Sequence, residues 1–220
     1  MNILVITEGP GDKEIYRHWI PTLNPNLSFV DNLQQIQSDN FSIIQGQGNP
    51  NYFDIIDRAI YDVNELGNID RLVIAVDSED MSKDEKRQEI EDYINGKVCS
   101  AEIIVLVQHF CIETWALGNQ KACSANPTTH PLIAYKRYFD VRQNDPELLL
   151  PWSSLELNRA QFAYKYLRAM LSDKYIRLSY KKGKPDVLTN KGYFNQIVSR
   201  YNRTGHINSF EVFIQAFSNP

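Results

Sequence analysis

The chain has 220 residues, 43% of them apolar, and a formal net charge of −4. This size allows one domain, or one domain with a helical addition, and the apolar content excludes a chain that is disordered throughout. No apolar run approaches the roughly 20 residues that span a bilayer, and the N-terminus lacks the basic segment of a signal peptide. The three cysteines form no CxxC pair, which argues against a zinc site or a disulfide framework. We therefore expect a cytoplasmic protein without a membrane partner.

Short apolar runs alternate with helical patterns in the first part of the chain. Strands are expected at 3–6, 41–45, 72–76 and 102–107. Helices are expected after Asp12, a candidate N-cap, and at 52–66, 83–94 and 109–117. This order predicts an α/β fold: a parallel, Rossmann-like sheet of about four strands flanked by helices.

The second part of the chain has helical patterns at 158–172, 190–202 and 209–217, with a loop or hairpin at 175–188. Its charge also differs. Residues 1–157 contain 12 Lys and Arg against 24 Asp and Glu, whereas residues 158–206 contain 11 Lys and Arg against two acids. An acidic front and a basic back are typical of enzymes that act on nucleic acids, although a solvated basic helix face would give the same pattern. We expect a catalytic domain at 1–125 and a helical, basic extension at 126–220.

Acidic residues follow three of the predicted strands. Glu8 follows the first strand, Asp77, Glu79 and Asp80 follow the third, and Glu113 comes shortly after the fourth. In open parallel sheets, ligands bind outside the carboxyl ends of the strands. Carboxylates without His or Cys partners are ligands for Mg²⁺ or Mn²⁺, which promote phosphodiester hydrolysis.

Each acid also has a purely structural interpretation. Glu8 could cap the helix that follows, Asp77 could end a strand, and Asp80 could cap the next helix. Glu113 could be a solvated helix residue. His109 could act as a proton shuttle or bond a backbone carbonyl. The glycine-proline turn after Glu8 matches neither a P-loop nor a dinucleotide-binding motif, which disfavours a mononucleotide site there.

Three segments together resemble the Toprim domain of topoisomerases, primases and the overcoming-lysogenization-defect class of nucleases. The first is VITEGPGD at 5–12, and the second is VIAVDSED at 73–80. The third, QHFCIETWAL at 108–117, is similar to a segment of small, stand-alone Toprim proteins of the RloB-like, defence-associated type. The resemblance covers about residues 1–120. It departs from the family at Glu79, where an Asp is usual, so that Asp80 is an alternate ligand.

The resemblance implies a metal-dependent nuclease that cleaves DNA or RNA, acts in bacterial defence against phage and works with a separate ATPase partner. It implies that Glu8, Asp12, Asp77 and Glu79 hold Mg²⁺ or Mn²⁺, with Glu113 as a further ligand or general base. A non-catalytic regulatory or nucleic-acid-binding subunit is the alternative, which the Glu79 departure favours. A homo-oligomer is left open.

The basic extension supplies candidate nucleic-acid contacts. Lysines can neutralise phosphates, and tyrosines can stack on unpaired bases. We expect phosphate binding from a loop with little apolar content, by Arg177, Lys181, Lys182 and Lys184. The candidates for base stacking are Tyr164, Tyr166, Tyr175, Tyr180, Tyr193 and Tyr201. Phe162, Tyr166 and Tyr193 also have the spacing of helix core residues.

Overall fold

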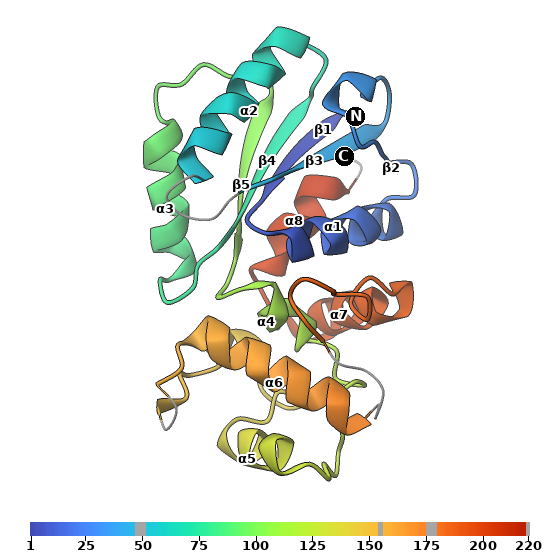
Figure 1. Ribbon diagram of the computed structural model, residues 1–220, viewed down its shortest axis with the longest axis vertical. Coiled ribbons are helices and arrows are strands. Elements are labelled where there is room, and N and C mark those ends of the chain that lie inside the picture. The colour runs from blue at the N-terminus through green and yellow to red at the C-terminus, as the bar shows by residue number, and fades with distance from the viewer. Residues whose placement is uncertain (47–51, 154–155, 175–179, 219–220) are drawn as a thin grey trace. The chain divides into compact units, whose positions relative to one another are not determined.

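The computed structural model describes residues 1–46, 52–153, 156–174 and 180–218. The chain divides into two compact units (Figure 1). The first comprises 1–76, 84–107 and 212–220, and the second comprises 77–83 and 108–211. Both units are thus assembled from separate stretches of sequence, unlike the single boundary at residue 125 that the sequence pattern indicated.

The first unit contains a five-stranded parallel sheet in the order β2-β3-β1-β4-β5. Helices α1 and α8 cover one face of the sheet, and α2 and α3 cover the other (Figure 1). The strands are β1 (Ile3–Thr7), β2 (Ser28–Phe29), β3 (Asn40–Gln45), β4 (Arg71–Asp77) and β5 (Glu102–Gln108). Its helices are α1 (Pro10–Leu23), η1 (Leu33–Gln35), α2 (Tyr52–Leu66), α3 (Lys83–Ile94) and most of α8 (Phe210–Phe217).

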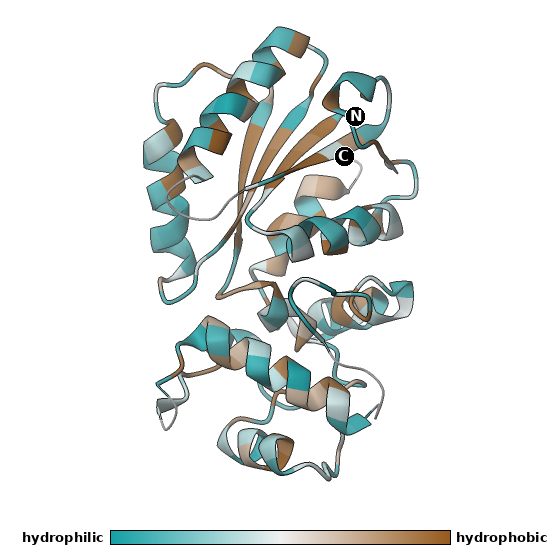
Figure 2. Cartoon of the chain, in the orientation of Figure 1, coloured by the Kyte–Doolittle hydropathy of each residue, from teal (hydrophilic) through white to brown (hydrophobic). Residues whose placement is uncertain are grey.

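The sheet forms because its central strands are apolar on both faces. Every residue of β1 is buried, and Val5 in β1 lies between Ile43 of β3 and Val73 of β4. Figure 2 shows these strands as the most hydrophobic part of the unit. On one face, α1 and α8 pack through aromatic edges, with Tyr16 and Phe213 centroids 5.1 Å apart. Aliphatic side chains of the strands and helices form a buried core against the sheet. This core holds the strands in place and so fixes where their carboxyl ends lie.

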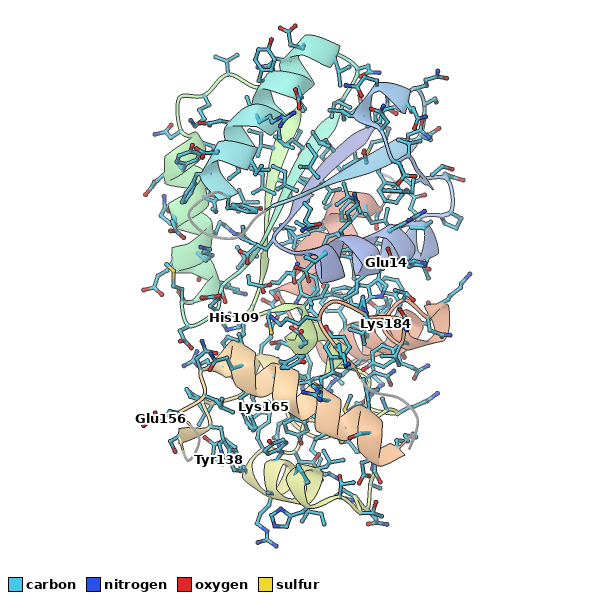
Figure 3. All side chains as sticks on the ribbon, viewed as in Figure 1. Glu14, His109, Tyr138, Glu156, Lys165 and Lys184 are labelled. Atoms are coloured by element: carbon cyan, nitrogen blue, oxygen red, sulfur yellow. The ribbon has the colours of Figure 1, made fainter. Side chains whose placement is uncertain are left out.

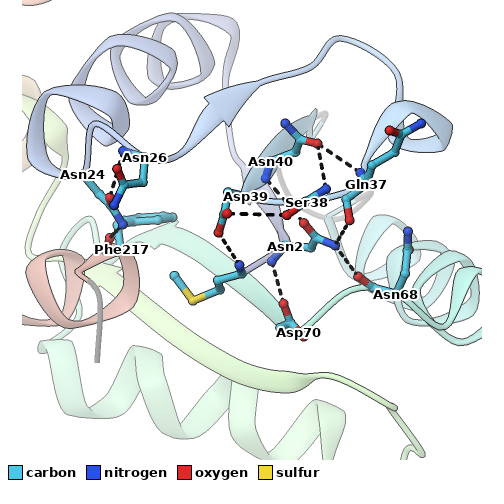
Figure 4. A network of polar contacts seen from close by, with 11 residues as sticks. Asn2, Asn24, Asn26, Gln37, Ser38, Asp39, Asn40, Asn68, Asp70 and Phe217 are labelled. Atoms are coloured by element: carbon cyan, nitrogen blue, oxygen red, sulfur yellow. Dashed lines mark hydrogen bonds and ion pairs between the residues drawn. The ribbon is translucent and has the colours of Figure 1, made fainter.

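A polar network holds the amino-terminal ends of the strands (Figure 4). The backbone amide of Asn2 donates to Asp70 at 2.6 Å, and its side-chain amide donates to the carbonyls of Gln37 and Asn68. These bonds satisfy buried polar groups where three segments meet. Since they lie at the strand starts, they support the scaffold and leave the carboxyl ends for ligands.

The second unit is mainly helical and has an aromatic core. Its helices are α4 (Ile112–Ala116), α5 (His130–Tyr138), η2 (Pro146–Leu148), α6 (Arg159–Lys174) and α7 (Lys191–Thr204). Phe162 of α6 packs against Tyr135 and Trp152, with ring centroids 5.1 Å away in both cases. Phe162, Tyr166 and Tyr193 are buried, which confirms the prediction that they are core residues.

The α/β class and the parallel sheet are confirmed, and β2 makes the sheet one strand larger than expected. Asp12 is not the N-cap of α1: the helix begins at Pro10, Gly9 is the N-cap, and Asp12 lies in the first turn. Proline suits this first position because it needs no hydrogen-bond acceptor. The helix expected at 109–117 is limited to Ile112–Ala116, and α5 was not anticipated. Among the described residues, no helix combines the length and apolar character needed to cross a membrane.

Candidate functional site

The segments that follow β4 and β5 are joined by backbone hydrogen bonds. The amide of Ser78 donates to the carbonyl of Gln108 at 3.0 Å, and the amide of Glu79 donates to the carbonyl of Phe110 at 2.9 Å. This is the edge at which open parallel sheets bind ligands. Residues 77–80 and 108–113 therefore form one surface within the second unit.

This surface contains two non-glycine residues with positive φ. Glu79 has φ 49° and Phe110 has φ 60°, in the left-handed region that side chains with a Cβ rarely adopt. The hydrogen bond between these two residues holds both conformations in place. Such backbone conformations persist where surrounding contacts enforce them, and they cluster at binding and catalytic sites.

Glu113, in α4, is a buried acid. Its side chain is 1% exposed, and Oε1 accepts a hydrogen bond from the Tyr180 hydroxyl at 2.9 Å. Within the described part of the chain, no N–H or O–H group donates to Oε2, and the weakly donating Cys111 thiol lies nearby. Burial of a carboxylate oxygen without a donor is unfavourable unless a cation or a proton compensates it. The interpretation of Glu113 as a solvated helix residue is therefore wrong.

A second carboxylate lies in the same neighbourhood. Burial raises the pKa of the Cys111 thiol well above its usual value, and the charges of Glu113 and Asp77 and a side-chain hydrogen bond with Glu113 raise it further, whereas Lys182 opposes them. Two carboxylates and one ammonium group thus act on one buried sulfur. Because the raised pKa keeps the free thiol protonated at neutral pH, Cys111 is not expected to act as a nucleophile.

Two hollows lie along α6, and the first of them begins at this surface. One, of about 380 Å³, is lined by Glu79, Tyr164, Lys165 and Lys182 among others. The other, of about 290 Å³, shares Lys165 and adds Arg168. The Arg168 guanidinium lies 5.5 Å from the centre of the Tyr164 ring, within cation–π range. We use the name α6 track for the surface formed by Tyr164, Lys165 and Arg168 of α6 together with Lys182 from the turn at 181–184. Figure 3 labels Lys165 on this surface.

His109 is held by a serine from the neighbouring segment. Ser78 Oγ lies 3.0 Å from His109 Nδ1 and also accepts a hydrogen bond from the Phe110 amide at 3.0 Å. With the amide as its donor, the hydroxyl can give its own proton to Nδ1, and the neutral ring then carries its proton on Nε2. The His109 ring also packs against Phe110, with centroids 4.0 Å apart. Figure 3 labels His109 at the start of this segment.

The other acids of the predicted metal site have different positions. Asp80 Oδ1 accepts a hydrogen bond from the Arg159 amide at 3.3 Å, so this carboxylate binds the first residue of α6. Glu8 lies in the bend after β1, and Asp12 lies in the first turn of α1; both belong to the first unit. Among the described residues, no group of three or more His, Cys, Asp and Glu side chains gathers as a metal site.

The predicted basic loop forms a tight turn. Residues Lys181 and Lys184 pair as an antiparallel bridge, with the Lys184 amide donating to the Lys181 carbonyl at 2.9 Å, and both are exposed. Tyr175 and Arg177 lie outside the described residues. Tyr180 is 1% exposed, so the expectation that it stacks on bases is wrong. Its hydroxyl is used by Glu113, which orients that carboxylate.

The sequence interpretation did not single out Ser78, and it included Lys165 and Arg168 only among the 11 basic residues of the extension. Positions 161, 165, 168 and 172 are all exposed on α6 and have helical spacing, which would have located this face. Nothing in the sequence would have indicated that a hydroxyl 31 residues away binds His109.

Comparisons with models of protein families, with curated proteins and with solved structures return no match for this chain.

Proposed function

We propose that this protein is a metal-dependent nuclease, in which Asp77 and Glu113 hold the metal ion and the α6 track holds the nucleic acid. The observation that carries the proposal is the buried Oε2 of Glu113, to which no N–H or O–H group donates in the described part of the chain. A second carboxylate, Asp77, acts on the same buried sulfur as Glu113. Two buried or half-buried acids in one place favour a cation between them.

The donor chemistry fits Mg²⁺ or Mn²⁺. Carboxylate oxygens are hard ligands, and the one nearby thiol, Cys111, stays protonated because burial raises its pKa. Mg²⁺ is usually bound by one or two carboxylates, with water and substrate phosphate oxygens completing its octahedron. Two carboxylates therefore suffice. Glu8, Asp12, Glu79 and Asp80 stay candidates from the family resemblance alone.

When bound, the metal ion activates water and stabilises charge on the leaving oxygen. Water adds to phosphorus, the phosphodiester P–O bond breaks, and the products are a phosphate monoester and a hydroxyl end. Within this chain, Lys165 and Lys182 neutralise the substrate phosphates. Ser78 orients the His109 ring so that its Nε2–H can donate a hydrogen bond to the leaving oxygen, which takes up the proton that the attacking water loses.

The test uses the purified protein with plasmid DNA, single-stranded DNA and tRNA, each with Mg²⁺, Mn²⁺ or EDTA. We expect metal-dependent cleavage of one substrate class, lowered about a hundredfold or more by Glu113→Gln and by Asp77→Asn. Both variants should also weaken Mn²⁺ binding, measured by electron paramagnetic resonance. Glu91→Gln, an exposed site on α3, is the matched control and should leave cleavage and binding unchanged.

Substitution of lysines in the α6 track should change the affinity for nucleic acid rather than the rate of the cleavage step. We expect Lys165→Ala to weaken nucleic-acid binding about tenfold and to reduce its salt dependence, because one phosphate contact is lost. Metal-dependent cleavage at saturating substrate should change little. If nucleic-acid binding were unchanged in both Lys165→Ala and Lys182→Ala, the hypothesis that the α6 track binds nucleic acid would be wrong.

A second function is favoured by one observation. Since no three metal-ligating side chains gather among the described residues, the protein could bind nucleic acid without cleaving it. In that case the Lys165→Ala variant would weaken binding, whereas Mn²⁺ would not bind and no substrate would be cut. This outcome would replace the nuclease proposal with a regulatory, nucleic-acid-binding subunit.

The proposal includes a role in defence against phage, with a separate ATPase as partner, which rests on the family resemblance. Expression of the wild-type chain together with its ATPase should lower phage plaque counts. Expression of Glu113→Gln should restore them, because the metal-binding carboxylate is absent.

A further inference from the structure

The larger of the two hollows along α6 has a wall that suits the polar edge of a base. It measures about 380 Å³, and its lining includes Glu79, Asn158, Gln161, Tyr164 and Lys165. All of these residues belong to the second unit. We call this space the Glu79 hollow. Its size falls in the range of small-molecule sites, which runs from roughly 300 to 1,000 Å³, and a single base is a group of this kind.

Two side-chain amides on this wall are held by the first turn of α6. Asn158 Oδ1 accepts the backbone amide of Gln161 at 2.8 Å, and Gln161 Oε1 accepts the backbone amide of Asn158 at 3.2 Å. This reciprocal pair is a capping box. Because each oxygen already accepts from the backbone, the groups that the two amides offer a ligand are their NH₂ donors. The amides therefore match acceptors on a base.

Glu79 adds an acceptor to the same hollow. Its amide donates to the Phe110 carbonyl, and the next residue, Asp80, accepts the Arg159 amide at the start of α6, so the backbone at Glu79 is held on both sides. The side chain is exposed, and among the described residues no hydrogen bond or ion pair occupies its carboxylate. An ionised carboxylate is an acceptor only, and its two oxygens can accept together. Glu79 therefore matches two neighbouring donors on a ligand.

An aromatic ring and a lysine supply the other contacts that a nucleotide needs. Tyr164 lines the hollow, and the Arg168 guanidinium lies 5.5 Å from the centre of its ring. Tyrosine rings and guanidinium groups both stack on bases that are not paired. Lys165 is exposed and lines both hollows along α6, so it adjoins the phosphate between two nucleotides of a strand that lies along this helix.

The polar groups of the hollow distinguish between bases. Guanine has two adjacent donors, N1–H and the N2 amino group, which a carboxylate accepts together, and two acceptors, O6 and N7, which suit amide donors. Adenine and cytosine each offer one amino group beside a ring nitrogen that accepts. Thymine and uracil offer one N3–H between two carbonyl oxygens, which a carboxylate repels. Guanine alone uses the carboxylate and the amides fully, and its N1 and N2 donors are accessible only when it is unpaired.

We propose that the Glu79 hollow binds an unpaired guanine of a nucleic-acid strand, with its N1 and N2 donors at Glu79, its ring at Tyr164 and a neighbouring phosphate at Lys165. This inference rests on the proposed function, because it takes the α6 track as the nucleic-acid site. It adds the base at which the strand is held, and it gives Glu79 a role in recognition rather than in metal binding.

The experiment measures binding of the full chain by fluorescence anisotropy in EDTA, so that metal binding and cleavage do not contribute. The probes are thymine strands of one length whose central base is guanine, adenine, cytosine or thymine, and uracil strands of the same design in RNA. We expect the guanine strand to bind about tenfold more tightly than the strand without guanine. Annealing the guanine strand to its complement should abolish this preference.

Four variants separate base recognition from a general loss of binding, and the melting temperature of each shows whether it is folded. Glu79→Gln should weaken binding of the guanine strand about tenfold and leave the thymine strand unchanged, because its NH₂ group would face the donors of guanine. Glu156→Gln is the matched control: Glu156 is an exposed acid of the same unit with φ 51°, close to the 49° of Glu79, and it does not line the hollow. Tyr164→Leu should weaken all strands alike, whereas Tyr164→Phe keeps the ring and should bind normally.

A guanine preference that is lost in Glu79→Gln and kept in Glu156→Gln would support the proposal. Equal binding of all strands, a preference that Glu79→Gln retains, or no binding of any strand would overturn it. An equal loss for every strand in Glu79→Gln, together with weaker Mn²⁺ binding by electron paramagnetic resonance, would also overturn it, because Glu79 would then be a metal ligand.

The nuclease proposal is tested separately by cleavage in Mg²⁺ or Mn²⁺. A guanine preference without cleavage would remove the nuclease and keep this inference. Cleavage without a guanine preference would keep the nuclease and remove this inference.

Discussion

The two units differ in what they bury. In the described part of the first unit, the buried polar residues are uncharged: Asn2, Thr7, Asn24 and Ser42. In the second, the described residues include two buried charged side chains, Glu113 and Arg200, each 1% exposed. The sheet unit has the composition of a scaffold, whereas the helical unit accepts charges that an ordinary core would not contain.

This difference indicates where function resides. A buried charge is unfavourable unless partners compensate it, so it persists where it specifies a structure or serves a ligand. Among the described residues, the terminal nitrogens of Arg200 donate to several acceptors although its Nε has no partner, whereas Glu113 has one O–H donor at Oε1 and no N–H or O–H donor at Oε2. The same unit therefore contains one buried charged side chain with several hydrogen-bond partners and one with few.

The largest effect should come from Arg200→Met. Its guanidinium donates to the carbonyls of Val141 and Asn144, both at 2.7 Å, and to His206 Nδ1 at 3.0 Å. Burial lowers the pKa of Arg200 to about 10, so it remains charged at neutral pH. Methionine would leave these acceptors unsatisfied, and we expect the free energy of unfolding to fall by roughly 3–5 kcal/mol. Urea unfolding would measure the loss. A change below about 1 kcal/mol would contradict the hypothesis that the hydrogen bonds of Arg200 stabilise the folded chain.

Leu4→Ala tests the scaffold. Leu4 is fully buried in the aliphatic cluster of the sheet, and its truncation should lower the free energy of unfolding by roughly 3 kcal/mol. At a temperature where the variant is folded, nucleic-acid binding should equal that of the wild type. A loss of binding in the folded variant would show that the first unit does more than support the strand ends.

Glu113→Gln should change stability in the opposite direction. The amide removes an uncompensated buried charge while its oxygen can still accept the Tyr180 hydroxyl. We expect the free energy of unfolding to rise by about 1 kcal/mol in EDTA, while cleavage is lost. Added Mn²⁺ should stabilise the wild type but not the variant. Loss of stability in EDTA would instead indicate that the carboxylate is needed by the fold.

The sequence predicted the first unit well because its signals are local. The helical periodicity of 52–66 and 83–94 coincides with α2 and α3, and the apolar runs locate four strands. The missed elements have weak signals: β2 has two residues, and α5 has a single buried residue, Leu132. Such short or exposed elements form through tertiary contacts rather than through their own pattern.

The candidate site was only partly predictable. Asp77 and Glu79 at the end of β4 follow from the strand pattern. The burial of Glu113 and Tyr180 does not, because their hydrogen bond joins residues 67 positions apart. For the same reason the sequence could not show that Asp80 binds the first amide of α6, 79 residues away. Long-range pairing decides which acid of a cluster is available to a ligand.

The smallest effect concerns Glu147, an acid of the second unit whose two carboxylate oxygens both have a hydrogen-bond donor. Its two oxygens accept the amide of Ser209 at 3.0 and 3.3 Å, and the Ser209 hydroxyl in turn receives bonds from Trp115 at 2.7 Å and from the His109 amide at 3.2 Å. Burial raises the pKa of Glu147 above its usual value of 4.5, although the bonds from Ser209 oppose this shift.

The folded chain consequently holds this proton more tightly than the unfolded chain. As the pH rises from the ordinary pKa to the folded pKa, the unfolded state loses its proton first, so the free energy of unfolding falls. Glu147→Gln removes this titration and should flatten the decline, measured from urea midpoints between about pH 4 and 7. Glu91→Gln, an exposed acid in the first unit, should leave the profile unchanged. If the profile of Glu147→Gln kept the slope of the wild type, burial would not be raising this pKa. The hydrogen bonds from Ser209 would then fully offset the unfavourable effect of burial on the charged form of Glu147.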